Sequence, residues 1–461
     1  MTWDHPAGAL SVVLCAALAG CSVGPAYRRP SIAPPESWRE TPTPSVWPAA
    51  DWWHGFGSQR LDQLIAQAER SNDDLAGAIA RVQEADAQVR IAGAPLLPSL
   101  DLGADATRER ASTSSGRLAV FNVFYPQLTA SYEVDFWGKN RALFASAQAS
   151  ARASRFDRQT VALTVVSSVA STYFQTLELR DRIAVAERNL ANGQKILRGL
   201  ELERTVGTAT GLDVAQQATA VALLDAALPP LVQQLRQTVY ALAVLIGSTP
   251  ESVAVDDGTL TELASPAIVA GLPSGLLARR PDVANAEEQL IAANADITVA
   301  RAALFPSIAL TASGGYESGT LTSLISPANR LYGLSAGLTQ PIFHGGALRG
   351  QVAYSRARYT ELLTTYHKTV LTAFSNVESA LVATRQTGEQ RDRQREAVAK
   401  AQRAYEFAQA QMAAGIVNIL TVLNTENALF SAEDVLVQVE YSHFQSMVDL
   451  FTALGGGWQQ V

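Results

Sequence analysis

The sequence is poor in the residues that build disulfides, metal centres and nucleic-acid surfaces. Of its 461 residues only two are cysteines, and both lie near the N-terminus, at Cys15 and Cys21. The rest of the chain therefore has no disulfide and no thiolate metal site. Acidic residues outnumber Lys and Arg by 43 to 36, and the bases form no cluster, which argues against nucleic acid as a partner.

The motifs of an enzyme or of a cofactor site are missing as well. No nucleophile motif is present, and the Gly455-Gly456-Gly457 run lacks the Lys-Ser/Thr that follows in a phosphate-binding loop. The five histidines show no His-x-x-x-His pairing: His5, His54, His344, His367 and His443. We therefore predict a protein that is not an enzyme and has no metal or other cofactor.

Apolar runs long enough to cross a bilayer are also lacking. Residues 9–20 are apolar but too few to span, and they end in Leu18-Ala19-Gly20-Cys21. This pattern is typical of a signal peptide, which we place at residues 1–20. The alternative is an unprocessed start, since residues 1–8 contain Asp4 and no Lys or Arg. No later segment offers about 18 uncharged apolar residues, so the helices of the mature chain should stand in water.

An internal repeat organises the sequence. Chance similarity between Ala-rich helices does not place Pro and Gly at matched positions. Here a constant offset of 208 relates the two halves: Asp74 to Asp282, Pro98 to Pro306, Gly138 to Gly346, Arg141 to Arg349 and Gly207 to Gly415. Each half should fold the same succession of elements. We expect an N-terminal arm over 21–58, repeat 1 over 59–265 and repeat 2 over 266–461.

Four segments alternate apolar and polar residues. In the first, Leu100, Leu102 and Ala104 alternate with Asp101 and Asp105. This period of two predicts strands at about 98–109, 123–136, 306–318 and 331–343. Their length matches tilted strands that cross a membrane. The alternative is a soluble sheet with one solvated face, whose sequence pattern is the same.

Four strands in a bilayer leave two edges of unpaired backbone groups, each costing several kcal/mol in hydrocarbon. One chain therefore cannot close a barrel, whereas three chains supply twelve strands. We expect a homotrimer with a mixed α and β membrane fold, in which a 12-stranded β-barrel is continued by an α-helical barrel. Its water-filled lumen should be lined by acids: Asp101, Asp105, Glu133 and Asp135.

Very long helices are permitted because no proline occurs between Gly138 and Pro229, or after Pro341. A helix over 139–205 would extend about 100 Å at 1.5 Å per residue. Ile183, Leu190 and Leu197 lie seven apart, which favours coiled-coil pairing. Besides a helical segment from Leu61 to Gly93, we predict helices over 139–205, 211–247, 281–303, 347–413 and 419–454.

These features resemble TolC-like outer-membrane factors of tripartite efflux pumps, in the lipoprotein branch known as NodT-type. The motifs that carry the resemblance are Gly24-Pro25-Ala26-Tyr27-Arg28-Arg29-Pro30, Trp52-Trp53-His54-Gly55-Phe56-Gly57, Leu61-Asp62-Gln63-Leu64-Ile65 and Leu276-Leu277-Ala278-Arg279-Arg280-Pro281-Asp282. The resemblance implies a passive exit duct for drugs or other small toxic compounds in the outer membrane of a Gram-negative bacterium. Alternatives are the outer-membrane conduit of a protein secretion system and a structural coiled-coil lipoprotein of the envelope.

The resemblance also implies partners and roles. Cys21 would carry the lipid that anchors the chain in the outer membrane, and Ser22 in place of aspartate favours that destination. A periplasmic adaptor protein would join the duct to an inner-membrane transporter of the RND type. The adaptor would dock on the two glycine turns: Val206, Gly207 and Thr208 in the first half, and Ala414, Gly415 and Ile416 in the second.

A periplasmic gate would lie just beyond these turns. The family commonly closes it with acids, and the matching positions here are Asp213, Leu420, Thr421 and Asn424. Thr421 and Asn424 depart from the acidic pattern. A ring of Asp213 would favour cations, whereas a ring of Leu420 would close by apolar contact and dewetting. Which of the two rings dominates stays open.

Overall fold

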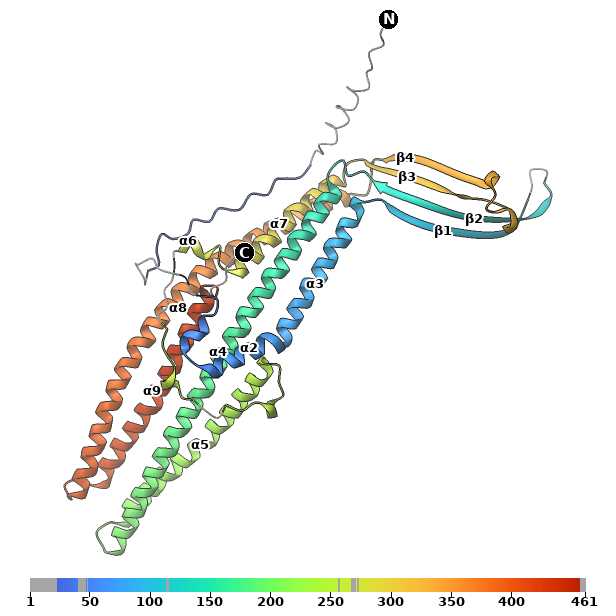
Figure 1. The fold of residues 1–461 in the computed structure, drawn as a ribbon. Helices are drawn as coiled ribbons and strands as arrows, with labels where there is room; N and C mark the ends of the chain where they lie inside the picture. Colours follow the sequence, from blue (N-terminus) through green and yellow to red (C-terminus); the bar gives the residue numbers. More distant parts are fainter. Residues whose placement is uncertain are drawn as a thin grey trace. The chain divides into compact units, whose positions relative to one another are not determined.

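The same series of elements occurs twice in the computed structural model of the chain (Figure 1). The structure describes residues 23–39, 47, 49–112, 116–255, 258–266, 271 and 273–456. The signal peptide, Cys21 and Ser22 lie outside these residues. The first half contains η1 (Trp52–Phe56), α2 (Gln59–Ser71), α3 (Asp73–Gly93), η2 (Ala94–Leu96), β1 (Ser99–Ser112), β2 (Leu118–Glu133), α4 (Lys139–Thr205) and α5 (Gly211–Leu245).

Short elements link this half to the second: η3 (Pro250–Ser252), η4 (Leu260–Glu262) and α6 (Pro273–Leu276). The second half contains α7 (Pro281–Ala302), β3 (Ser307–Tyr316), η5 (Leu321–Ser323), η6 (Pro327–Asn329), β4 (Arg330–Thr339), α8 (Ala347–Ala413) and α9 (Ile419–Ala453). Helices α8 and α9 begin and end 208 residues after α4 and α5, so the sequence offset is also a structural one. Helices α4 and α8 have 67 residues each and occupy the predicted ranges 139–205 and 347–413.

The four strands form one antiparallel sheet in the order β1-β2-β3-β4. Leu102 lies opposite Leu128, Ala130 opposite Ala312, and Ala312 opposite Leu334. Opposed residues place their side chains on the same face, so these apolar residues share one face across all four strands. Within the described part of the chain, β1 and β4 each pair on one side only. The sheet therefore has two open edges.

The predicted helical segment from Leu61 to Gly93 is wrong in one respect, because two helices meet at Asn72. The backbone of Asn72 is extended, with φ −73° and ψ 127°. Its side-chain oxygen accepts the N–H of Leu75 at 3.0 Å, and its amide donates to the carbonyl of Leu245 at 2.8 Å. Asn72 is thus an N-cap for α3, which competes with continuation of α2.

The chain divides into two compact units, and each draws on both repeats: residues 1–32, 80–156 and 285–368 in one, and 33–79, 157–284 and 369–461 in the other. The core of the second unit is aromatic. The ring of Trp52 stacks on Phe451 with centroids 4.7 Å apart, and Phe56 meets Phe174 edge-on at 4.9 Å. Burial of such a side chain stabilises the fold by about 3 kcal/mol, so η1 fastens the N-terminal arm to α4 and α9.

One described helix, α5, is long and apolar enough to cross a membrane by length and composition, although none of that stretch is buried. Two observations favour an aqueous environment for α5. Pro229 and Pro230 lie inside α5 and remove two backbone donors, so two carbonyls of this helix lose their intrahelical partners, which water can replace. Its repeat counterpart α9 carries acids such as Glu426 and Glu440, and α5 and α9 share a core at their N-terminal ends.

Candidate functional site

Each long helix ends in the same glycine turn. Gly207 and Gly415 have φ values of +82° and +71°, in the left-handed region that glycine alone adopts at little cost. The N–H of the following residue donates to the carbonyl five positions earlier, at 3.0 Å for Thr208 and 2.9 Å for Ile416. This Schellman pattern satisfies helix-end carbonyls and turns the chain sharply.

Both turns present apolar side chains to solvent. Val206 is 74% exposed and Ile416 is 72% exposed, at the ends of α4 and α8. The residues beneath them form one buried cluster shared by α4, α8 and α9: Leu200, Tyr405, Ala408, Ile419, Val422, Leu423 and Leu429. Val214 and Ala220 of α5 pack against it. The two turns therefore expose apolar side chains directly above one shared buried cluster.

The gate position of the first half has a structural role of its own. The carboxylate of Asp213 accepts hydrogen bonds from the N–H of Thr210 at 2.8 Å and from its hydroxyl at 2.6 Å. The Thr210 hydroxyl in turn accepts the N–H of Asp213 at 3.2 Å, which completes a capping box at the start of α5. These bonds, the hydroxyl first, hold the pKa of Asp213 below its ordinary value. The exposed carboxylate is thus fixed and charged.

The second half replaces this charge with neutral groups. Thr421 is the repeat equivalent of Asp213, and its N–H donates to the side chain of Asn418 at 3.3 Å. Leu420 is 48% exposed, and Thr421 and Asn424 are exposed on the same first turns of α9. One half thus offers a fixed carboxylate and the other an apolar and amide surface.

Sequence patterns gave no sign of a buried acid behind these positions. Glu426 of α9 is only 5% exposed, and its Oε1 atom has no hydrogen-bond partner. Burial raises the pKa of Glu426 to about 7, and that of Tyr405 on α8 to about 12. The sequence pattern does not predict that these two side chains are buried. Glutamate and tyrosine are common on the exposed faces of long helices, and only the packing of the helices shows that these two are covered.

The acids predicted to line the barrel divide into two groups. Asp101 and Asp105 are exposed on β1, on the face opposite the apolar residues. Glu133 is the last residue of β2, and its carboxylate pairs with Lys139 at 2.7 Å. The acid that β2 contributes to the predicted lumen, Glu133, therefore lies at the helix end of the sheet, and its charge is balanced by Lys139.

Asp135 does not belong to the sheet, contrary to the predicted strand over 123–136. Strand β2 ends at Glu133, and the Asp135 carboxylate accepts the backbone N–H groups of Asn140 and Arg141, both at 2.9 Å. It also pairs with the Arg141 guanidinium at 3.1 Å. A carboxylate on these amides stabilises the positive end of the helix dipole, so Asp135 caps α4.

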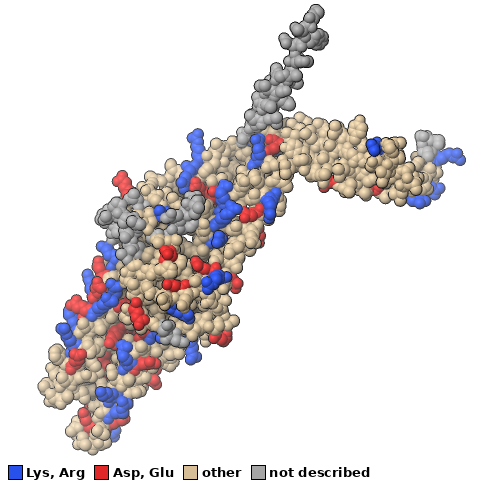
Figure 2. All heavy atoms as spheres, in the orientation of Figure 1, with Lys and Arg blue, Asp and Glu red and all other residues tan. Residues whose placement is uncertain are grey.

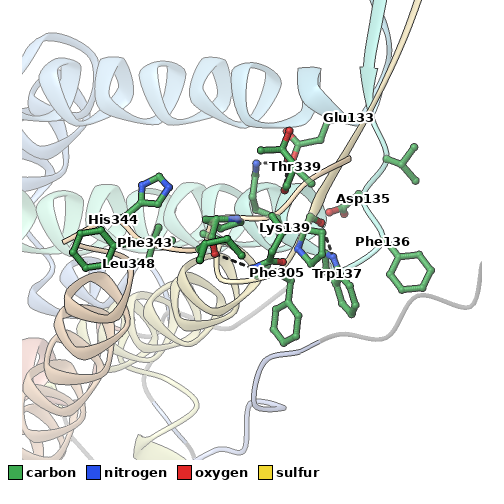
Figure 3. Close-up of a pocket in the computed structure, with 18 residues that line it drawn as sticks. Glu133, Asp135, Phe136, Trp137, Lys139, Phe305, Thr339, Phe343, His344 and Leu348 are labelled. Carbon is green, nitrogen blue, oxygen red and sulfur yellow. Dashed lines mark hydrogen bonds and ion pairs between the residues drawn. The ribbon is translucent and has the colours of Figure 1, made fainter. Parts of the chain in front are cut away.

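The junction between strands and helices is aromatic (Figure 3). Trp137 donates to the carbonyl of Pro306 at 2.8 Å and stacks on Phe305, with ring centroids 4.6 Å apart. These residues line a cavity of about 620 Å³ together with Phe343. Ile342 and Phe343 are 88% and 85% exposed. An indole ring such as that of Trp137, with a polar N–H on an apolar body, suits the border between a membrane and water.

The comparisons with known proteins place this arrangement in a family. The model described as "Outer membrane efflux protein" matches residues 64–248 and again residues 272–456, one match in each repeat. The chain belongs to the outer membrane efflux protein family. The two matches begin and end 208 residues apart, which is the offset that relates the two repeats.

Full-length relatives agree with this membership. The chain is 41% identical to the pyoverdine export outer membrane protein OpmQ of Pseudomonas aeruginosa over 456 residues, covering 96% of each chain. It is 32% identical to the toluene efflux pump outer membrane protein TtgF of Pseudomonas putida, covering 98% of this chain and 97% of that one. The crystal structure of the Campylobacter jejuni CmeC outer membrane channel has the same fold, with a TM-score of 0.90, 24% identity, and 95% and 96% of the two chains covered. The protein is thus a TolC-like outer-membrane channel of an efflux system.

The glycine turns yield a direct test. Gly207→Val and Gly415→Val force a β-branched residue into the left-handed region, at a cost of about 1–2 kcal/mol per site. We expect each variant to reach the outer membrane but to support less export, measured as drug susceptibility of a strain that depends on this channel. Gly199→Val is the matched control, because Gly199 lies inside α4 with open space around its Cα. Equal export by all three variants would show that the turns are not needed.

Glu426 makes the stability of this region depend on pH. Its pKa is about 7 in the folded chain against an ordinary 4.5, so between these values only the folded chain holds the proton. Stability therefore falls as pH rises from about 4.5 to 7 and stays low above. We expect Glu426→Gln to stabilise the protein by roughly 1–3 kcal/mol at pH 8 and to change little at pH 4.5, as measured by unfolding midpoints.

The exposed Glu201 provides the matched control, since Glu201→Gln makes the same change on α4 in contact with water. A gain in stability from Glu426→Gln that is equal at both pH values would contradict the assignment.

Proposed function

We propose that the protein is one of three identical subunits of a passive duct, which carries small molecules through the outer membrane. The two open edges of the sheet carry this proposal. Every unpaired N–H and C=O on β1 and β4 would cost several kcal/mol in hydrocarbon, so the edges must meet partners. Three four-stranded sheets joined edge to edge give a closed barrel of twelve strands.

The two faces of the sheet support the orientation of such a barrel. The face that carries Leu102, Tyr332 and Leu334 leaves these side chains 77%, 90% and 83% exposed in the single chain. Exposed apolar residues on one continuous face suit lipid. Asp101 and Asp105 on the other face suit a water-filled lumen.

The energy for transport would come from partners. Among the residues that the structure describes, no group of three or more His, Cys, Asp or Glu could hold a metal ion. The exposed apolar side chains of Val206 and Ile416 offer docking points for a periplasmic adaptor. This adaptor would connect the duct to an inner-membrane transporter of the RND type. We propose small organic compounds as cargo, since OpmQ is named for pyoverdine export and TtgF for toluene efflux. These names favour efflux over the protein-secretion alternative.

The N-terminal arm supports a lipid anchor at Cys21. It runs antiparallel to α7: Arg29 pairs with Glu287 at 2.7 Å, Asn294 donates to the carbonyl of Pro25 at 2.9 Å, and Arg301 to that of Val23 at 3.3 Å. Strand β3 begins at Ser307, shortly after Arg301. Val23, the described residue nearest to Cys21 in the sequence, thus lies at the strand end of α7, where the bilayer would begin.

Lipidation at Cys21 is tested by metabolic labelling with radioactive palmitate. We expect wild-type protein to be labelled and Cys21→Ala to be unlabelled. Cys15→Ala is the matched control and should keep the label, because Cys15 would leave with the signal peptide. Label that persists in Cys21→Ala would refute the assignment.

The duct itself is tested by conductance in planar bilayers. We expect purified trimers to conduct weakly at rest, and Leu420→Ser to conduct severalfold more because a polar residue cannot dewet a constriction. Asp213→Asn, which keeps a hydrogen-bond acceptor for the Thr210 cap, should lower the preference for cations. Leu202→Ser is the control, since Leu202 is 73% exposed on α4 and is not a gate position. The absence of any conductance from wild-type trimers would overturn the duct.

A further inference from the structure

We propose that three arginines on the outward face of the sheet, Arg108, Arg110 and Arg330, bind the phosphates of the glycolipid in the outer leaflet, lipopolysaccharide. The inference rests on the proposed orientation of the barrel. It concerns a surface that plays no part in export. The observation behind it is that the three residues lie on one face of the sheet, each toward the end of its edge strand that is remote from the helices.

All three arginines lie on the apolar face of the sheet. Arg108 and Arg110 alternate along β1 with the same phase as Leu100 and Leu102. Arg330 has the phase of Leu334 along β4 and lies opposite Tyr316 of β3. Registers across the four strands place these positions on one face. The face that would meet lipid thus ends in positive charge.

The arginines lie where a membrane crossing ends. Arg108 is the tenth residue of β1 counted from Ser99, and Arg330 is the residue of β4 farthest from α8. A tilted strand needs about 9–11 residues to cross the hydrocarbon. The apolar stretches before Arg108 and Arg330 fill that length, so each of these two guanidinium groups reaches the outer headgroups on its own strand. Figure 2 shows basic side chains at the end of the sheet remote from the helices.

No acid on this face neutralises the arginines. In the described strands the acidic residues have the opposite phase: Asp101, Asp105, Glu109 and Glu133. Arg108 faces Asn122 across the strand pair, and Arg110 faces Val120. All three arginines are exposed, and within the described residues none makes an ion pair or hydrogen bond. Arg108 and Arg110 lie two residues apart on one face of β1, so these two unpaired guanidinium groups beside hydrocarbon repel each other unless an anion joins them. Arg330 lies on β4, at the opposite edge of the sheet.

A phosphorylated glycolipid matches this surface in chemistry and position. Guanidinium groups bind phosphate through paired N–H donors, and an apolar face below them accepts acyl chains. Tyr332, two residues from Arg330 on the same face, adds an aromatic ring at headgroup level. This phosphorylated glycolipid is absent from the inner leaflet, which consists of phospholipids. The site would therefore hold the barrel in an asymmetric membrane.

The test uses the trimer extracted in mild detergent from native outer membranes. The variant carries Arg108→Gln, Arg110→Gln and Arg330→Gln together. Lipopolysaccharide retained per trimer is measured by mass spectrometry, and rebinding is measured with lipid A that has or lacks its phosphates. We expect the variant to retain and rebind phosphorylated lipid A roughly tenfold less. Phosphate-free lipid A should bind both proteins equally weakly.

The control makes the same change at three exposed helix positions, with Arg198→Gln, Arg356→Gln and Arg403→Gln, and should behave as wild type. Equal retention by the strand variant and wild type would overturn the proposal, as would equal binding of phosphate-free lipid A. If the triple variant fails to form trimers, Arg330→Gln alone should show a partial loss, and no loss would count against the site. Conductance of the same samples separates the arginine site from the proposed duct. If trimers of the arginine variant conduct and still retain their glycolipid, only the arginine site is refuted.

Discussion

The backbone hydrogen bonds at the two edges of a four-stranded sheet constrain everything else in this molecule. A sheet that ends at β1 on one side and β4 on the other cannot rest in hydrocarbon alone, because no water is there to satisfy its amides and carbonyls. Closure by identical neighbours is the economical solution for a chain with four strands. The apolar outward face, the acids on the opposite face and the aromatic junction at Trp137 are all consistent with it.

Because the chain is duplicated, each repeat contains both strands suited to a membrane and a long helix suited to water. Each repeat passes from strands into a helix of 67 residues and returns through a glycine turn. Equivalent positions then diverge in chemistry. Asp213 caps its helix with a charge, whereas Thr421 does not, and Asp135 caps α4 at a position that Phe343 occupies in the second half. The fold is repeated, and the side chains that meet partners, cargo or lipid are free to differ.

Much of the architecture follows from the sequence, because Pro and Gly act locally. The predicted bounds of α4 and α8 agree with the structure to the residue, and the period-two alternation predicts all four strands. Strand ends were less accurate: β2 begins at Leu118, not at residue 123, since Arg117 to Asn122 lack clear alternation and only pairing with β1 defines them. The break at Asn72 was missed because capping by its side chain requires a neighbour, Leu245, that is distant in sequence. Glu426 was missed for the same reason, as burial of its carboxyl depends on how α8 and α9 pack.

The central claim, closure of the barrel by neighbouring copies, is tested most directly by cross-linking the two strand edges. Cysteine replaces Ala104 on β1 and, one at a time, Leu334, Ala336 or Leu338 on β4, in a chain that has no other cysteine after Cys21. Oxidation in native outer membranes should give a covalent dimer and trimer on a denaturing gel for at least one pair, and nothing larger. Chains that stay monomeric for every pair, or that form ladders beyond the trimer, would contradict the account.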